Sequence, residues 1–501
     1  MSTTVLFVGV VVFAFVAGRV LDRFTHKAFA LSGAEYLLLG AILGPFALGV
    51  LDAEVLRALD LFVSTVLGVI GFLVGLSIRQ VRASTEAFLA GGGATVAIIV
   101  SVAAVATLII QLLDPSLLYV EPLVFEPITA SSDSLVSLWI SPEALWIGLT
   151  VGATAGTCSA ALVDAALLRF GVGAERAALL RAMASSAQLL AVFAFGLAMA
   201  GSRATTAASA LGLTVVEWST ITILSGSFTG LLFSIFLGRE GDPMRLLVAA
   251  VGVIVFAAGI GAALGVSPLF ANLFAGLTLA LTSSHAARLD EALKPLRFPT
   301  TVLVLLLAGA TWAPATGWYW ALVPGYVLLR VLARRVFSRV AVSTFVDEPA
   351  HARGIGRALL GQGVLASAIS LAFAQRFPEL AGPVTSTVLG GVLLTDLFAM
   401  RSLRRYLADA GEIKALAPPE PAPEPEPSPE ADPHGEHEAE PEPSEPEPES
   451  TEPASAEPPA AEPEPEAKPP AAEPKLESEA PEPGPAPEPK PAPASGEGAS
   501  S

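Results

Sequence analysis

The sequence predicts an all-α polytopic membrane protein of about 13 transmembrane helices in inverted repeats, with two discontinuous crossing helices and a disordered C-terminal tail. The first observation is composition: 52% of the 501 residues are hydrophobic and only 15% are charged, which is outside the range of soluble globular domains. The second is a series of apolar runs long enough to cross a membrane. The third is an alternation of basic residues between the loops.

The apolar runs define the predicted spans one by one. A helix needs about 20 apolar residues to cross a hydrocarbon core about 30 Å thick. The runs that meet this rule are 4–21, 30–50, 58–78, 88–112, 144–166, 177–200, 214–237, 244–265, 267–284, 298–313, 317–338, 357–375 and 383–400, thirteen in all.

The basic residues indicate the orientation and test the number of spans. With the N-terminus outside, 22 Lys and Arg residues fall in the inner loops and the inner C-terminal flank, against 3 in the outer loops. One further base, Arg330, lies inside a span. A wrong number of helices would scramble this alternation. The sequence therefore predicts a multi-pass protein of the plasma (inner) membrane, with the N-terminus outside and the tail in the cytoplasm.

The end of the chain has a different composition. From Ala415 onward there are 23 acidic residues and 3 Lys, a net charge of −20, so the remainder of the chain is nearly neutral at +2. The same segment holds 27 of the 41 prolines. Such a segment lacks the apolar surface to offset the entropy of ordering. We expect a transmembrane domain over 1–413 and an extended, disordered tail over 414–501. A solvating role is favoured over a basic partner, whose identity would be unknown, and nothing suggests nucleic acid.

Two spans contain small and hydroxyl residues at membrane depth. The fifth contains "GATAGTCSAALVDA" and the twelfth begins "GRALLGQGVLASAIS". Such residues allow a helix to unwind so that freed carbonyls and hydroxyls can coordinate a cation, although close helix packing is the alternative. The two spans are seven apart and so enter the membrane from opposite sides. Paired broken helices of this kind point to a transporter's binding site.

At this point the residues carry a family resemblance. "GAILGPFALGVL" followed by "LGVIGFLVGLSIR" resembles the start of the monovalent cation:proton antiporter superfamily, the sodium/hydrogen exchanger-like proteins, and within it the second antiporter family. "LGVSPLFANLFAGLTLAL" is similar to the second half of the family's pattern. "GQGVLASAISLAFAQ" and "VLGGVLLTDLFAMRSLRRYLADAGEI" are similar to its last two helices. The resemblance covers about residues 1–413.

The resemblance implies a thirteen-helix fold, a homodimer, and exchange of Na⁺ or K⁺ for protons by alternating access, with no cofactor. Thr154 and Thr157 match the family's unwound segment, and Gly361 and Gly363 match its glycine-rich crossover partner. In the family, the helix after the first broken one carries an Asp that binds the cation or the proton in turn.

The chain departs from that pattern in the helix predicted over 177–200, which contains no acidic residue. Depending on register, the family's acidic pair falls on Ser185–Ser186 or on Gln188–Leu189. Hydroxyl and amide oxygens can ligate a cation, but Ser and Gln do not titrate near neutral pH. Proton coupling therefore needs another group or is lost.

Three other acids are candidates for that group. Asp164 is on the fifth span, Asp396 on the last and Glu217 near the outer end of the seventh. Each is within a turn or two of a predicted boundary, which favours an interfacial acid over a proton carrier. Asp164 is the best candidate of the three.

Arg330 is the remaining charged candidate for the ion pathway. It can pair with Asp164 or Asp396, or its long stem can extend inward to join Arg334 and Arg335. The sequence does not choose between these alternatives.

Two functions remain open. The first is a cation:proton antiporter with an altered core. The second is a transporter-fold protein without proton coupling that acts as a passive conduit, a sensor or a scaffold through its tail. An enzyme is disfavoured because no nucleophile or His/Asp/Glu cluster lies at membrane depth. The single cysteine, Cys158, excludes a Cys-based metal site and is expected to be a buried packing residue.

Overall fold

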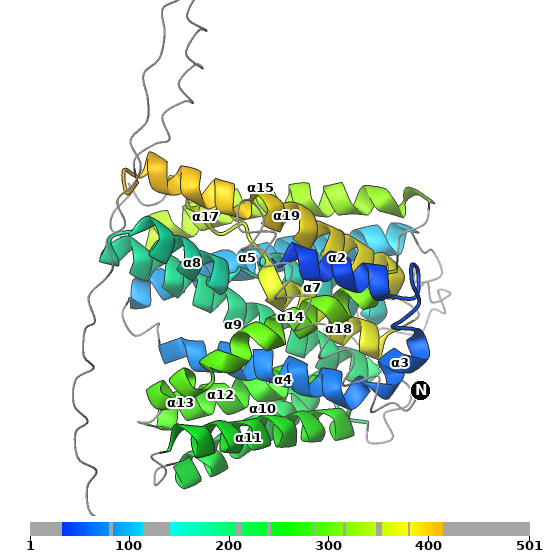
Figure 1. The fold of residues 1–501 in the computed structure, drawn as a ribbon. Coiled ribbons are helices and arrows are strands. Elements are labelled where there is room, and N and C mark those ends of the chain that lie inside the picture. The colour runs from blue at the N-terminus through cyan, green and yellow to red at the C-terminus, as the bar shows by residue number, and fades with distance from the viewer. Residues whose placement is uncertain are drawn as a thin grey trace, which may run out of the picture. The chain divides into compact units, whose positions relative to one another are not determined.

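The computed structural model describes residues 33–79, 84–113, 141–205, 212–237, 242–283, 286–313, 317–346, 353–378 and 381–413. The regular elements within these ranges are all helical (Figure 1). They are α2 (Ala34–Leu43), α3 (Ala53–Ala58), α4 (Asp60–Leu76), α5 (Thr85–Leu113), α7 (Pro142–Gly156), α8 (Ala160–Phe170), α9 (Ala174–Thr205), α10 (Val215–Leu237), α11 (Pro243–Leu264), α12 (Pro268–Thr282), α13 (Ala286–Ala292), α14 (Lys294–Ala310), a short 3-10 helix (Gly317–Ala321), α15 (Leu322–Phe345), α17 (Ile355–Ala358), α18 (Gly363–Arg376) and α19 (Ala381–Asp409).

The predicted spans agree with these helices. The first predicted span, 4–21, and the tail over 414–501 lie outside the described residues, but each of the other twelve spans coincides with a described helix or helix pair. Seven described spans are long and apolar enough to cross a membrane, with α7 and α8 counted together as one, or eight if α13 and α14, bent by 56°, form one span. The rest are short, like α2 and α12, are broken, or carry several arginines, like α15. The protein is therefore a multi-span integral membrane protein.

Several helices begin with the same local signal. Ser141, Asp242 and Ser267 each precede a proline, and each side chain accepts a hydrogen bond from a backbone N–H in the first turn of α7, α11 or α12. The cap supplies an acceptor for one of the free N–H groups, and proline has no N–H to leave unpaired. These starts are fixed by sequence alone.

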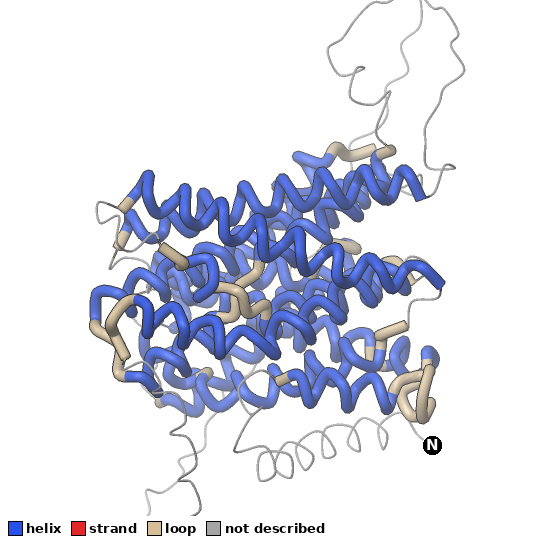
Figure 2. The backbone as a smooth tube through the Cα atoms, turned by 90° about the horizontal axis from the view of Figure 1, so that it is seen from above, coloured by secondary structure: helices blue, strands red, loops and turns tan. Residues whose placement is uncertain are grey.

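The helices pack in layers that place the broken ones inside. In Figure 1, α15 and α19 lie along one side of the bundle, α10, α11 and α13 lie along the other, and α7, α9, α14 and α18 lie between them. Figure 2 shows loop segments in the interior of the bundle as well as at its ends. Non-helical backbone in the interior of a membrane protein is tolerated only where protein or water surrounds it.

Small residues serve close packing in the third predicted span. A Cβ on Gly71 of α4 would lie 2.1 Å from the carbonyl oxygen of Leu269 on α12, and one on Gly276 of α12 would lie 2.3 Å from that of Phe72. The glycines therefore let the two backbones touch, as is common between membrane helices. Here the "GVIGFLVGL" motif is a packing surface between α4 and α12.

Candidate functional site

Two broken helices meet in the interior of the bundle. The first break, residues 157–159, separates α7 from α8, and the second, 359–362, separates α17 from α18. The backbone N–H of Ser159 donates to the carbonyl oxygen of Gly361 at 2.9 Å. The two breaks therefore touch, which confirms the predicted pair of discontinuous crossing helices.

Local chemistry holds the first break open. Thr157 has extended backbone (φ −64°, ψ 152°), and its hydroxyl donates to the carbonyl oxygen of Thr154 at 2.7 Å. The Thr154 hydroxyl donates to the carbonyl oxygen of Val151, also at 2.7 Å. Ser159 then caps α8 by accepting from the N–H of Leu162. The hydroxyls of Thr157 and Ser159 thus pair with backbone groups that a continuous helix would have paired.

Glycine is required at the start of α18. Gly363 has φ +66°, in the left-handed region that other residues adopt with difficulty. A Cβ at this position would lie 2.6 Å from the Ser159 hydroxyl oxygen. Both the turn and the contact between the two breaks therefore depend on Gly363.

Two arginines of α15 bind the carbonyl ends of the broken helices. Arg330 donates to the carbonyl oxygens of Ala155, Leu360 and Thr157, at 3.2, 2.6 and 3.0 Å. Arg334 donates to those of Gly156 and Thr157 at 2.9 and 2.6 Å. The last carbonyls of a helix have no partner within it and carry partial negative charge. The guanidinium groups supply both the donors and the opposite charge.

Asp396 of α19 binds the opposite kind of helix end. Its Oδ1 accepts from the N–H of Gln362 at 2.7 Å, and its Oδ2 accepts from the N–H of Gly363 at 3.0 Å. The first N–H groups of a helix are unpaired and carry partial positive charge, so a carboxylate is stabilised there. Asp396 thus anchors the start of α18.

The charged side chains buried in the described part of the chain are Arg330, Arg334 and Asp396, and all three lie at this crossing. Their exposed fractions are 0%, 1% and 4%. Their formal charges sum to +1. Ionisable groups inside a membrane protein are expensive to bury and usually mark a functional site. The crossing is therefore the candidate site.

A neutral polar network joins the two breaks. The Tyr326 hydroxyl of α15 lies 3.2 Å from the Thr154 hydroxyl and accepts from Nε2 of Gln362 at 2.7 Å. On the other side, Nε2 of Gln188 of α9 donates to the carbonyl oxygen of Cys158 at 3.0 Å. Cys158 itself is buried, as predicted. Gln188 of α9 therefore contacts the first break, and Tyr326 of α15 contacts residues at both breaks.

Some buried oxygens at the start of α18 have no hydrogen-bond partner among the described residues. They are Oε1 of Gln362 and the hydroxyls of Ser367 and Ser370. A buried polar atom without a partner is unfavourable by about 1–3 kcal/mol. Oε1 of Gln362 is therefore one atom at the crossing that is free to accept a ligand; the unpartnered hydroxyl of Thr95, whose Cγ2 would lie 3.2 Å from a Cβ on Gly156, is beside the first break.

Six of the nine residues predicted for the ion pathway gather at the crossing. They are Thr154, Thr157, Gln188, Arg330, Gly361 and Gly363. Ser185 and Ser186 are buried in α9, but the Ser186 hydroxyl donates to the carbonyl oxygen of Met183 in its own helix. In the register of α9, Gln188 is the residue that reaches the break.

The structure also places the two charged candidates. Asp164 pairs with Arg181 at 2.7 Å, and both side chains are 39% exposed, so a coupling role for Asp164 stays a prediction. Among the described residues Arg330 forms an ion pair with neither Asp164 nor Asp396; its buried guanidinium meets that of Arg334 at the carbonyl oxygen of Thr157.

Sequence reasoning also missed Tyr326, Arg334 and Gln362. Tyr326, Arg330 and Arg334 are four residues apart and so share one face of α15, a spacing visible in the sequence. Arg334 was assigned instead to the inner flank of its span. The spacing alone does not reveal that this face meets the two breaks.

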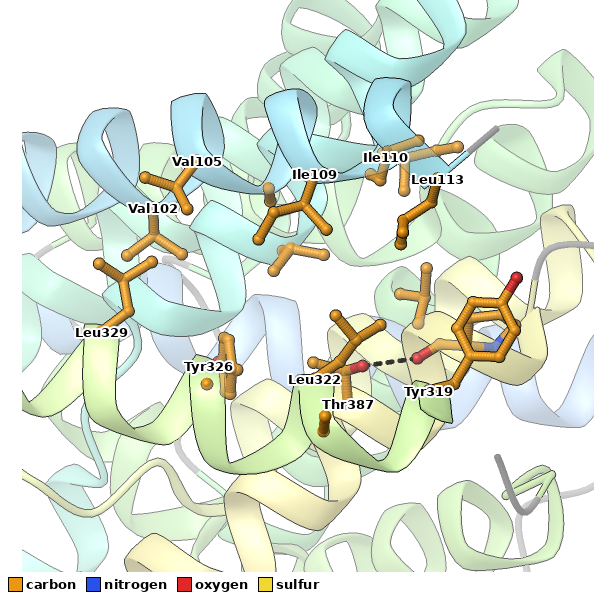
Figure 3. A pocket seen from close by; sticks show the side chains of 17 residues that line it. Val102, Val105, Ile109, Ile110, Leu113, Tyr319, Leu322, Tyr326, Leu329 and Thr387 are labelled. Atoms are coloured by element: carbon orange, nitrogen blue, oxygen red, sulfur yellow. Dashed lines mark hydrogen bonds between the residues drawn. The ribbon is translucent and has the colours of Figure 1, made fainter. Parts of the chain in front are cut away.

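An apolar cavity of about 520 Å³ lies beside the crossing, between α5, α7, α15 and α19. Val102, Val105 and Ile109 of α5 face Leu322 and Leu329 of α15 across it (Figure 3). Tyr326 lines the cavity as well, so its hydroxyl connects the cavity wall to Thr154 and Gln362. The wall is mostly apolar, with hydroxyls at Tyr319, Tyr326 and Thr387, whereas the buried charged groups are at the crossing.

Comparisons with known proteins identify the fold. No family model and no curated protein matches the sequence. Among solved structures, the chain is similar to a structure of the sodium proton antiporter MjNhaP1 from Methanocaldococcus jannaschii at pH 8, with a TM-score of 0.59 and 15% identity over 82% of this chain and 100% of that one. A second structure of MjNhaP1, from electron microscopy, gives a TM-score of 0.54 and 14% identity over 83% of this chain and 99% of that one. The chain therefore has the fold of a sodium proton antiporter, and the predicted resemblance is confirmed at the level of the fold.

Proposed function

We propose that the protein is a secondary transporter that exchanges Na⁺ or K⁺ for protons by alternating access, with Asp396 as the coupling carboxylate. The observation that carries the proposal is the position of Asp396: among the described residues it is the buried acid, and it lies where the two broken helices cross. Exchange needs a group that is charged in one state and protonated in the other. The similarity to MjNhaP1 supports the class of transporter.

The contacts of Asp396 suggest how one site serves two ions. When ionised, its carboxylate accepts from two backbone N–H groups and can also ligate a cation. Oε1 of Gln362, whose backbone N–H binds Asp396, has no partner among the described residues and is a candidate further ligand. When Asp396 is protonated, the cation loses its charged ligand. Cation and proton therefore compete for one group.

Competition for a single carboxylate determines the stoichiometry. With Asp396 ionised and empty, the three buried charges sum to +1, and binding either one monovalent cation or one proton brings the sum to +2. The two loaded states carry equal charge. We therefore propose electroneutral exchange of one cation for one proton, whose driving force does not depend on the membrane potential.

A second candidate function has its own support. The carbonyl oxygens that an unwound helix would offer to a cation accept hydrogen bonds from Arg330 and Arg334, and neither Ser185–Ser186 nor Gln188–Leu189 of α9 supplies the acid that the resemblance implies. Carbonyl oxygens already occupied by arginines, together with the missing acid, favour a transporter-fold protein without proton coupling. It would act as a passive conduit, a sensor or a scaffold.

The test is ion exchange in proteoliposomes loaded with a pH-sensitive dye, under imposed Na⁺ or K⁺ gradients between about pH 6 and 9, where a tuned carboxylate can titrate. We expect proton movement in the parent protein, none in Asp396→Asn, and a shifted pH profile in Asp396→Glu, which keeps the titratable group. Asp164→Asn is the matched control and should keep the parent's activity. Monodisperse gel filtration establishes that each variant is folded.

The outcomes separate the candidates. No response to either ion in folded parent protein rejects coupled exchange and leaves the uncoupled alternative. Loss of exchange in Asp164→Asn but not in Asp396→Asn transfers the coupling role to Asp164. The homodimer, the plasma-membrane location and the orientation with the N-terminus outside stay predictions, which crosslinking and accessibility labelling of introduced cysteines can test.

A further inference from the structure

A second, basic pocket lies away from the crossing. It has a volume of about 340 Å³ and is lined by Arg335 and Arg339 of α15, by Arg357 of α17, and by Gly354 and Gly356. Three guanidinium groups around one hollow make a site for an anion, because arginine presents several donors that match phosphate geometry.

The two glycines create the hollow. A Cβ on Gly356 would lie 2.5 Å from the carbonyl oxygen of Arg334, so α17 packs directly on the backbone of α15. A Cβ on Gly354 would lie 2.6 Å from Nη2 of Arg357. Without side chains at these positions, the Arg357 guanidinium is held beside the two arginines of α15.

Among the described residues, one acid forms an ion pair with the arginines of the pocket. Arg357 pairs with Asp409 of α19 at 3.1 Å, but the two side chains are 36% and 61% exposed, so solvent screens the pair. In the part of the chain that the structure describes, no acid forms an ion pair with Arg335 or Arg339. Within the described residues, these two positive charges have no acidic partner.

Helix geometry places the Arg339 end of the pocket near the depth of lipid headgroups. If the crossing is near the middle of the membrane, as in other transporters with broken helices, Arg330 marks that level. With a rise of about 1.5 Å per residue, Arg335 and Arg339 lie about 7 and 14 Å further along α15. Half of the hydrocarbon core is about 15 Å. Arg339 is therefore at the edge of the core, where long basic side chains reach phosphates.

An apolar row on α15 leads to the pocket. Leu328, Leu332 and Val336 are 71%, 58% and 48% exposed and four residues apart, so they form a lipid-facing row. Arg335 and Arg339 are three and seven residues after Leu332 and therefore share that face. A lipid whose acyl chain lies along the row would have its headgroup at the arginines.

We propose that this pocket binds the phosphate group of an anionic phospholipid, whose acyl chain lies along Leu328, Leu332 and Val336. The bound lipid joins α15 to α17. Because Arg330 and Arg334 extend from the same helix to the crossing, the lipid stabilises the arrangement of the two broken helices.

The test is binding of phosphatidylglycerol to the full chain in detergent, measured by native mass spectrometry and by the melting temperature. Phosphatidylcholine with the same acyl chains and inorganic phosphate are the comparison ligands. The variant is Arg335→Gln with Arg339→Gln. Its matched control is Arg401→Gln with Arg405→Gln, also two exposed arginines four residues apart, on α19.

We expect phosphatidylglycerol to bind the parent and the control and to raise their melting temperatures, and the α15 double variant to bind roughly thirtyfold more weakly. Equal binding by both double variants, or equal binding of phosphatidylcholine by the parent, overturns the proposal. Equal stabilisation by inorganic phosphate would instead assign the pocket to a soluble anion. If the double variant does not fold, Arg339→Gln alone serves, with an expected loss of roughly fivefold. These outcomes do not depend on ion exchange.

Discussion

Replacing Asp396 with asparagine removes the negative charge at the crossing while keeping the size of the side chain. Asparagine retains one acceptor oxygen and replaces the other with an NH₂ donor. One of the two backbone N–H groups, of Gln362 or Gly363, then faces a donor and is left unpaired. The two buried arginines lose the nearby opposite charge.

The size of the effect follows from these contacts. A hydrogen bond to a charged group contributes about 1.5–3 kcal/mol, and a buried unpaired N–H is unfavourable by about 1–3 kcal/mol. We therefore expect Asp396→Asn to lower the free energy of unfolding by about 3–5 kcal/mol. Asp164→Asn makes the same chemical change at a pair that is 39% exposed on both sides, where about 0–1 kcal/mol is expected.

The assay is unfolding of the two purified variants in mixed micelles, followed by tryptophan fluorescence. A difference of more than about 2 kcal/mol between them agrees with the assignment of Asp396 as the anchor of α18. Equal stabilities would refute it, because the buried carboxylate would then contribute no more than an exposed one.

Three further predictions concern the crossing. Gly363→Ala should lower the free energy of unfolding by about 1–2 kcal/mol or more, because it places a side chain in left-handed backbone against α8. Gly361→Ala is the control and should be tolerated, because its Cβ would meet no heavy atom closer than 3.3 Å. Thermal melts of the two variants compare them. Gln188→Leu should slow transport in proteoliposomes by removing the donor to the first break, while Ser186→Ala, whose hydroxyl serves its own helix, should not. Tyr326→Phe should lower the free energy of unfolding by about 1–3 kcal/mol in the micelle assay, since it removes an acceptor and leaves a buried amide N–H unpaired; an unchanged value would contradict the network.

The α9 helix illustrates what local pattern can reveal. Its apolar character and its lack of an acid inside the predicted span are properties of consecutive residues, so the sequence alone predicts them, although the helix extends beyond the predicted 177–200 to Ala174–Thr205. The same holds for the two breaks, where glycine and hydroxyl residues accumulate, and for the proline-preceded starts of α7, α11 and α12.

The ranking of the acids shows where that reasoning ends. Asp164 and Asp396 are both close to predicted span boundaries, and their neighbours along the chain do not separate them. In space, Asp164 meets Arg181 at an exposed position, whereas Asp396 meets the start of α18 in the interior. Burial depends on which helices pack together, and no local property of either residue encodes it.

The sequence by itself determined that this protein crosses the membrane many times, that two of its helices are broken, and that α9 lacks the expected acid. These features follow from hydrophobicity and helix-breaking residues, which act over a few turns of chain. Only the tertiary structure decided which charges meet at the crossing, because Arg330 lies 175 residues from Ala155, and Asp396 lies 34 from Gln362. Partners at such separations are brought together by packing, and packing determined that arginines bind the carbonyls and an aspartate binds the amides.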